Sequence, residues 1–286
     1  MGETPQYRLV VFDDLDDPKA VRDLFVRVTG AHPTDAMQWV ARVPGVWPKP
    51  LDEAMTRSLL DGLYDLEVAA EAWRTDKFPE LGMPRPVHVG SCEEGGFRVN
   101  GLRGEPTHWV PWDKFELVSA GLIDAADEFR DVSPSSWLQG INAGARLLLG
   151  RGPKRPRKSR AMRIPRDPVP EVILVRKDPR VTFRIHAGKM NYNSLGDRLR
   201  PTSAENFPIF LADLCARATS AYVTHPTRDM LSSDVTEEDV FPDSQSLLDY
   251  SLHRLLWSWY RRDGRARMEA EGEGEGEGTD EADTEA

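Results

Sequence analysis

Two aspartates follow an apolar stretch near the N-terminus, in a spacing that could present carboxylates to a metal ion. The segment LVVFDDLDDP places Asp14 and Asp16 two positions apart, after residues typical of a β-strand. One class of phosphatases uses Asp-x-Asp at such a position, with one carboxylate as nucleophile and the other as general acid/base beside Mg²⁺. Pro18 stands where that class has Thr or Val, and its later lysine and paired aspartates are not found in a suitable context. We favour an acidic turn that stabilises the next helix through the helix dipole. A Mg²⁺-dependent phosphatase is the third alternative for function.

The histidines and cysteines do not form a zinc-binding pattern. His88 lies four positions before Cys92, His108 lies sixteen positions after it, and Cys215 is the other cysteine. Zinc sites usually present ligands as closely spaced Cys or His pairs. Residues four apart on a strand share a face, which leaves a weak site as an alternative. We predict a buried cysteine, sheet histidines and no metal. The two cysteines form no disulfide pattern, which indicates a reducing, cytoplasmic setting.

Motifs for nucleophilic or nucleotide chemistry are missing. Ser91 follows Gly90 but lacks the Gly-x-Ser-x-Gly context of a hydrolase elbow. The segment LLLGRGPKRPRKS does not keep the spacing of a phosphate-binding loop, and Pro153 and Pro156 remove amide donors that such a loop needs. No Gly-x-Gly-x-x-Gly motif is present. We therefore predict a protein that is not an enzyme and has no cofactor.

Charge is distributed unevenly along the chain. The formal net charge is −10, yet residues 269–286 contain nine acidic residues and no basic ones, which leaves the rest close to neutral. Residues 146–166 contain nine Arg or Lys and no acid. Such a segment can neutralise phosphates and bind nucleic acid in a salt-sensitive way, although it is more often a solvated loop. The acidic tail could also fold back and screen it. The candidate nucleic-acid residues are Lys154, Arg155, Arg157, Lys158 and Arg160.

The elements that must position these residues begin with a small N-terminal module. YRLVVF predicts a strand, and Asp17 with Pro18 predicts a helix start. Apolar spacing predicts a helix ending at Gly30, a second helix capped by Thr34, and a third with Met55, Leu59 and Leu63 facing inward. The segment EVAAEAWR closes the module as a strand. The expected order is β-α-α-β-α-β.

This module resembles a known binding domain. The helix ending in VTG, the DAMQWVARVP helix, the proline-bounded turn and the LLDGLYDLEVAAEAW ending are similar to the C-terminal domain of the bacterial ribosomal stalk protein. ClpS-type protease adaptors share that fold. The resemblance covers roughly a quarter of the chain and implies a protein-binding module. The stalk family's lysine-rich face is replaced here, and Asp13-Asp14-Leu15 matches the ClpS-type Asn-Asp-Asp only in part. The expected partner-contact residues are Asp23, Arg27, Gln38 and Arg42.

A second module is rich in strands. Short alternating segments between residues 84 and 124 predict meandering antiparallel strands, and residues 133–150 predict a capped helix. EVILVRK-DP-RVTFRIHA predicts a hairpin turning at Asp178-Pro179. A helix is expected from Ser203 to Ala218, with its buried stripe at Phe207, Phe210, Leu211 and Leu214. The pattern resembles small bacterial pleckstrin-homology-like domains.

The predicted architecture is α+β: a module at 5–76, a β-rich domain with packed helices at 84–222 carrying a basic loop at 150–167, a helix at 240–263 and a disordered acidic tail at 264–286. The aromatic stripe of the last helix could lie on a membrane surface, but we expect it to pack on its own domain. No segment has the roughly 18 apolar residues of a membrane span. The expected function is non-catalytic protein binding, as an adaptor or scaffold linked to translation or proteolysis. Electrostatic RNA binding through residues 151–166 is the alternative.

Overall fold

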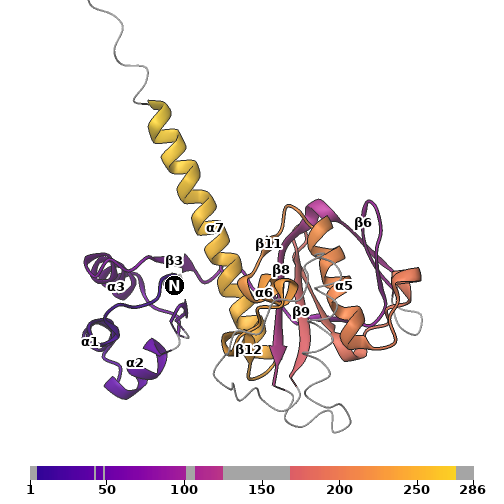
Figure 1. The fold of residues 1–286 in the computed structure, drawn as a ribbon. Helices are drawn as coiled ribbons and strands as arrows, with labels where there is room; N and C mark the ends of the chain where they lie inside the picture. The colour runs from indigo at the N-terminus through magenta and orange to yellow at the C-terminus, as the bar shows by residue number, and fades with distance from the viewer. Residues whose placement is uncertain (1–4, 42, 48, 101–106, 125–167, 275–286) are drawn as a thin grey trace, which may run out of the picture. The chain divides into compact units, whose positions relative to one another are not determined.

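The computed structural model describes residues 5–41, 43–47, 49–100, 107–124 and 168–274. Side chains are described as far as residue 263. The chain is an α+β protein that forms two compact units (Figure 1). Unit 1 combines residues 1–78 with residues 253–286, and unit 2 spans residues 79–252. None of the helices in the described ranges is long and apolar enough to cross a membrane.

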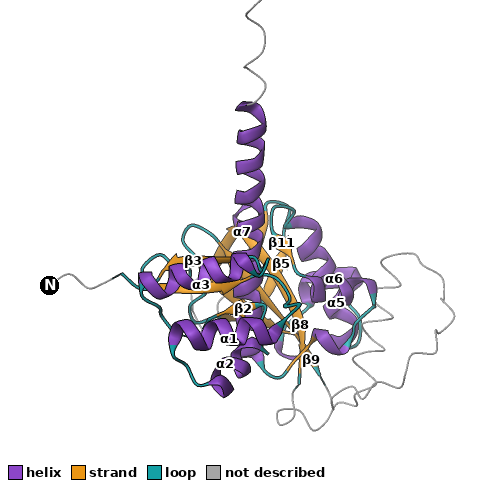
Figure 2. Cartoon of the chain, turned by 90° about the vertical axis from the view of Figure 1, so that its left-hand side faces the viewer, coloured by secondary structure: helices purple, strands orange, loops and turns teal. Residues whose placement is uncertain are grey.

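Unit 1 has the predicted β-α-α-β-α-β order. Its strands form a three-stranded antiparallel sheet in the order β2-β1-β3. Figure 2 shows the three helices over one face of this sheet. The elements are β1 (Tyr7–Val11), α1 (Pro18–Thr29), α2 (Pro33–Val40), β2 (Gly45–Val46), α3 (Glu53–Asp65) and β3 (Ala70–Arg74).

The ends of α1 follow from the sequence as predicted. The Asp17 side chain accepts hydrogen bonds from the amides of Lys19 and Ala20, both over 3.0 Å. Pro18 occupies the first turn, where its missing N–H costs nothing. Gly30 ends the helix with a φ of 67°, a left-handed conformation that glycine adopts without steric penalty.

The start of α2 differs from the prediction. Thr34 was the expected cap, but the helix begins at Pro33 and His32 is the cap residue. The imidazole Nδ1 of His32 accepts a hydrogen bond from the Thr34 amide over 3.3 Å. A proline at the first helical position fixes φ in the helical range and needs no acceptor for its nitrogen. The helix therefore starts before Thr34.

The core of unit 1 is built on three aromatic rings. The ring centroids of Phe25, Trp39 and Trp47 lie 4.4 to 4.6 Å apart. Leu59 and Leu63 of α3 are fully buried beside them, as predicted. Met55 was expected to face inward, and this prediction is wrong because its side chain is 36% exposed. Thr56 is buried in its place.

Thr56 can enter the core because its hydroxyl is satisfied locally. Oγ1 donates a hydrogen bond to the carbonyl oxygen of Asp52 over 2.6 Å, one turn earlier in the helix. A buried hydroxyl with a partner avoids the desolvation penalty of an unpaired one. The buried stripe of α3 is therefore Thr56, Leu59 and Leu63, at the spacing i, i+3, i+7.

The second face of this sheet is covered by residues from the far end of the chain. Helix α7 (Ser244–Gly274) belongs to unit 1 from His253 onward. Tyr260 stacks on Phe12 with ring centroids 4.5 Å apart, and Trp259 lies 5.9 Å from Trp73 of β3. Val10 is fully buried although it points away from the α1–α3 layer. The aromatic stripe of the last helix packs on its own unit, as predicted.

Unit 2 contains a six-stranded sheet and a three-stranded sheet. The larger sheet has the order β11-β8-β9-β10-β4, and β12 also pairs with β8. Its strands are β4 (Arg85–Val87), β8 (Phe115–Ile123), β9 (Val169–Arg176), β10 (Val181–His186), β11 (Tyr222–Val223) and β12 (Val240–Phe241). The smaller antiparallel sheet consists of β5 (Gly90–Cys92), β6 (Gly96–Val99) and β7 (His108–Pro111).

The predicted hairpin and long helix of unit 2 are confirmed. Strands β9 and β10 pair antiparallel around the turn at Asp178 and Pro179. Helix α5 (Ser203–Arg217) is capped by Thr202, whose side chain and that of Glu205 form a capping box. All four residues of its predicted apolar stripe are buried in the core shared with the larger sheet.

Two short helices follow α5. They are α6 (His225–Ser232) and the 3₁₀ helix η4 (Glu237–Asp239), and further 3₁₀ turns are η1 (Trp112–Lys114), η2 (Ala187–Lys189) and η3 (Asn193–Arg198).

The observed division differs from the predicted domains in its C-terminal part. Residues 223–252 belong to unit 2, and α7 continues to Gly274 instead of ending near residue 263. The sequence RARMEAE from residue 265 contains strong helix formers ahead of the alternating Gly and Glu, which explains the extension. The predicted helix at 133–150, the basic loop at 150–167 and the last twelve residues of the tail lie outside the described residues.

Candidate functional site

The helices of unit 1 present a charged outer face. Val21, Leu24 and Phe25 form the buried stripe of α1, so Asp23 and Arg27, four residues apart, lie together on its exposed side. Gln38 of α2 is also exposed, whereas Arg42 lies outside the described residues.

Within this face, the two charges of α1 are in different situations. Arg22 donates to the Asp23 carboxylate from Nε over 2.8 Å and from Nη2 over 2.5 Å. Arg27 forms no ion pair with any residue that the structure describes. The guanidinium of Arg27 is therefore available to an acidic group on a partner without breaking an internal pair.

Apolar side chains accompany these charges. Among the described residues, eight large apolar side chains are exposed, and five of them belong to unit 1, the smaller unit. They are Met37 of α2, Met55 and Tyr64 of α3, Leu66 directly after α3, and Tyr260 of α7. Tyr64 is 83% exposed. Methionine and aromatic residues are enriched where proteins contact one another.

The acidic turn after β1 has structural partners. Asp17 caps α1, and the Asp13 carboxylate accepts a hydrogen bond from the Ala69 amide over 3.0 Å, just before β3. Asp14 and Asp16 are exposed, and no group of three close metal-binding side chains in the described part of the chain includes them. Asp13 and Asp17 thus hold the backbone at the start of α1 and before β3, as expected of an acidic turn with a structural role.

The histidines and cysteine weighed for zinc do not come together. His88 contacts the carbonyl oxygen of Lys189 through Nδ1 over 3.2 Å, while His108 lies 3.4 Å from Arg85. Cys92 packs against the core of unit 2, and burial raises the pKa of its thiol to about 12. A thiol held protonated is a poor metal ligand and a poor nucleophile.

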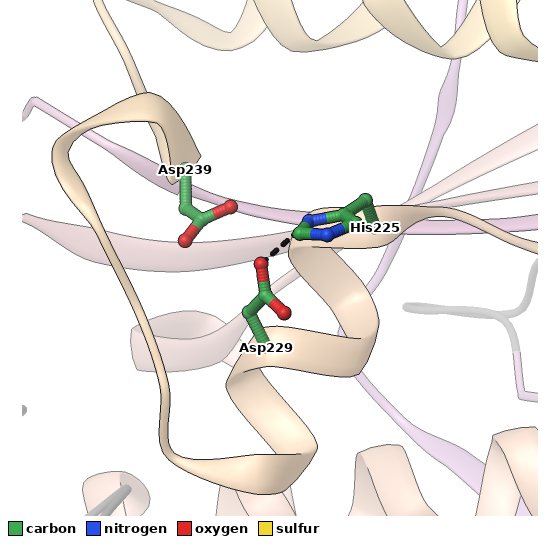
Figure 3. A group of neighbouring side chains, drawn as sticks. All are labelled: His225, Asp229 and Asp239. Carbon is green, nitrogen blue, oxygen red and sulfur yellow. Dashed lines mark ion pairs between the residues drawn. The ribbon is translucent and has the colours of Figure 1, made fainter.

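A different set of metal-binding side chains gathers in unit 2. His225 is the first residue of α6, Asp229 lies one turn later, and Asp239 ends η4 (Figure 3). One ligand atom from each residue lies within 4.8 Å of the other two. The imidazole Nδ1 of His225 is 2.6 Å from Oδ2 of Asp229. The sequence pattern did not predict this cluster, whose one local signal is the His-x₃-Asp spacing on a helix.

Buried hydroxyl groups fix α6 against strand β8. The Ala120 amide donates to Oγ1 of Thr227 over 2.7 Å, and the hydroxyls of Thr224 and Thr227 are 2.8 Å apart. The Thr224 amide also donates to the Val118 carbonyl over 3.1 Å. All three threonine and serine side chains in this network, including Ser119, are fully buried. The helix that carries His225 and Asp229 is therefore anchored at its N-terminus.

Asp239 is held by its own turn and by the adjoining strand. Its Oδ2 accepts hydrogen bonds from the amide of Thr236 over 2.7 Å and from the Thr236 hydroxyl over 3.2 Å. Strand β12 starts at the next residue and pairs with β8. The ligand-bearing segments are thus both tied to the same central strand.

The electrostatics of the cluster are unfavourable for two free carboxylates. Burial raises the pKa of Asp229, the negative charge of Asp239 raises it further, and His225 partly offsets both. Asp239 is 2% exposed, while the side chain of His225 is 78% exposed. The arrangement places two carboxylates, one of them buried, beside a solvent-exposed imidazole.

Comparison with protein-family models, with curated proteins and with solved structures found no match to this chain.

Proposed function

We propose that this protein is a non-catalytic adaptor that recognises another protein through the helices of unit 1. The observation that carries the proposal is the concentration of exposed methionine, tyrosine and leucine side chains on the unit whose core is already complete. Because the aromatic core of Phe25, Trp39 and Trp47 forms without them, the exposed side chains of Met37, Met55 and Tyr64 contribute little to folding. Burying them against a partner would recover roughly 25 cal/mol for each Å² of apolar surface.

Charged and polar side chains on α1 and α2 would supply specificity. Arg27 has no ion-pair partner among the described residues, and Gln38 is exposed next to Met37. Interface cores favour Met, Tyr and Arg over Lys and Glu. The resemblance to stalk-protein and ClpS-type domains supports a link to translation or proteolysis.

The proposal is tested with the full chain as bait in a lysate of its source cell, treated with nuclease and washed at moderate salt. The retained protein is then purified and its affinity measured by calorimetry. We expect Arg27→Glu combined with Met37→Ser to weaken binding at least tenfold. The control is Lys177→Glu combined with Met83→Ser, which likewise reverses one basic charge and removes one methionine, but on unit 2, where Met83 is 95% exposed. Equal affinities for both double variants would contradict the proposal.

Nucleic-acid binding is the second candidate. It rests on the nine basic residues of 146–166, which carry no intervening acid. Lys154, Arg155, Arg157, Lys158 and Arg160 lie in this stretch, outside the described residues. Phosphate contacts by such a segment give binding that weakens steeply as salt rises.

A further inference from the structure

We propose that His225, Asp229 and Asp239 bind a divalent ion of a first-row transition metal, with Zn²⁺ as the representative ion. The proposal is independent of the adaptor function because it concerns unit 2 alone. It rests on three observations: the convergence of one nitrogen and two oxygen ligands, the burial of Asp239, and the anchoring of both segments on β8.

The geometry suits a single ion. The three ligand atoms lie within 4.8 Å of one another, and Figure 3 shows the Asp239 carboxylate directed toward the other two side chains. Two ligands about 2.1 Å from one zinc ion lie about 3 to 3.5 Å apart. The 2.6 Å contact between His225 and Asp229 therefore widens slightly on binding. The proton on Nδ1 of His225 leaves to solvent, and the ion takes its place between nitrogen and carboxylate.

Asp239 is the second, independent indication. A carboxylate that is 2% exposed carries a large desolvation penalty unless a positive charge or several donors offset it. Its hydrogen bonds are those from Thr236, and both reach Oδ2. In the described part of the chain, no Lys or Arg forms an ion pair with Asp229 or Asp239, and the imidazole of His225 is the one basic group paired with Asp229. A dication would neutralise the excess negative charge.

The site is built before an ion arrives. Metal affinity depends on groups that orient the ligands as well as on the ligands themselves. Thr236 fixes the Asp239 carboxylate, and the buried hydroxyls of Thr224 and Thr227 fix the helix that carries the other two ligands. His225 remains exposed, which leaves the ion an entry path from solvent.

The ligand set selects the class of metal. Calcium needs six to eight oxygens and magnesium prefers an octahedral oxygen shell with several waters. Imidazole suits zinc and the other later first-row ions, and carboxylates are accepted by zinc as well. Three protein ligands leave at least one position for water or for a ligand from another molecule.

The test uses the full chain, stripped with chelator, dialysed and titrated with Zn²⁺ in a calorimeter. We expect saturable binding of one ion with a micromolar or lower Kd. Asp239→Asn and His225→Gln should each weaken it at least tenfold. The matched control is Glu238→Gln, which removes one charge from the neighbouring exposed residue of the same turn. Parallel titrations use Ca²⁺ and Mg²⁺, and circular dichroism verifies the fold of each variant.

Three results would overturn the proposal. They are the absence of saturable Zn²⁺ binding, equal affinities in Asp239→Asn, His225→Gln and Glu238→Gln, and binding of Ca²⁺ or Mg²⁺ as tightly as Zn²⁺. Since Asn keeps an acceptor for the Thr236 amide, Asp239→Asn should fold normally. If it does not, His225→Gln decides alone, because that side chain is 78% exposed and lies outside the core.

Discussion

His253 donates a hydrogen bond from Nε2 to the carbonyl oxygen of Val11 over 3.0 Å, and thereby joins the C-terminal helix to the first strand. A carbonyl oxygen only accepts, so Nε2 carries the proton in this contact. The imidazole is 4% exposed, its ring lies 6.0 Å from that of Phe12, and burial lowers its pKa to about 4. The ring is therefore neutral at pH 7 in the folded chain.

This buried histidine predicts acid sensitivity of unit 1. In the unfolded chain the imidazole takes up its proton near pH 6.5, whereas in the folded chain it does so near pH 4. The unfolded state thus binds more protons between these values. The stability that the neutral His253 contributes to the folded state is fully present above pH 6.5. It is lost as the pH falls toward 4, by at most about 1.4 kcal/mol per pH unit.

The measurement is the free energy of unfolding at pH 7 and pH 5, from urea titrations followed by tryptophan fluorescence. We expect the loss between the two pH values to be smaller by about 1 to 2 kcal/mol in His253→Gln than in the native chain. Glutamine keeps a donor for the Val11 carbonyl but does not titrate. His108→Gln in unit 2 is the control. A pH dependence unchanged in His253→Gln would show that another group governs the acid response.

The corrected face of α3 predicts opposite outcomes for two neighbouring positions. Leu59→Ala removes a fully buried side chain and should cost about 2 to 5 kcal/mol of unfolding free energy. Met55→Ala changes an exposed side chain and should stay within about 0.5 kcal/mol. Urea titration of both variants measures the difference. Similar losses of unfolding free energy at the two positions would show that Met55 faces inward after all.

The hydroxyl of Thr227 is predicted to stabilise unit 2 through one amide. Thr227→Val keeps the shape but leaves the Ala120 amide without its acceptor, which should cost about 1 to 3 kcal/mol. Thr227→Ser retains the acceptor and should lose less. Thermal unfolding of the two variants gives the comparison, and amide hydrogen exchange at Ala120 reports the bond directly. Equal stability of Thr227→Val and the native chain would contradict this role.

The opposed charge segments predict a salt-dependent interaction with nucleic acid. Deleting residues 269–286 removes nine negative charges and should raise the affinity for RNA at low salt, because these charges no longer compete for the basic segment. Changing Lys154, Arg155, Arg157, Lys158 and Arg160 to Ser should lower retention on heparin and flatten its dependence on salt. Fluorescence anisotropy with a labelled RNA measures both. If neither the deletion nor the five substitutions changed the affinity for RNA, nucleic-acid binding would be removed as a candidate function.

Local patterns were enough to predict the elements of unit 1. The 3.6-residue spacing of Val21, Leu24 and Phe25, the cap at Asp17 and the stop at Gly30 each depend on neighbours within one or two helical turns. The inward place of Thr56 could not be predicted, because a threonine is polar by type and becomes buried only when its hydroxyl finds a backbone acceptor.

Contacts between distant parts of the chain could not be predicted from the sequence. Nothing in the residues around Phe12 or Trp73 indicates that Tyr260 and Trp259 will cover them, since these contacts join residues 248 and 186 positions apart. The cluster in unit 2 was missed for a related reason. Asp239 follows Asp229 after a turn of unpredictable path, and only the pairing of β12 with β8 brings it back toward α6.

The composition of unit 1 from both ends of the chain has a consequence for biosynthesis. Residues 79–252 leave the ribosome as one continuous stretch, so unit 2 can fold as soon as it has emerged. The N-terminal strands must wait for the helix that carries His253 and Tyr260, which contact Val11 and Phe12 and are translated afterward. Residues 7–74 are therefore translated before unit 2 but complete their fold only after it has emerged, and until then the sheet face around Phe12 stays exposed on the nascent chain.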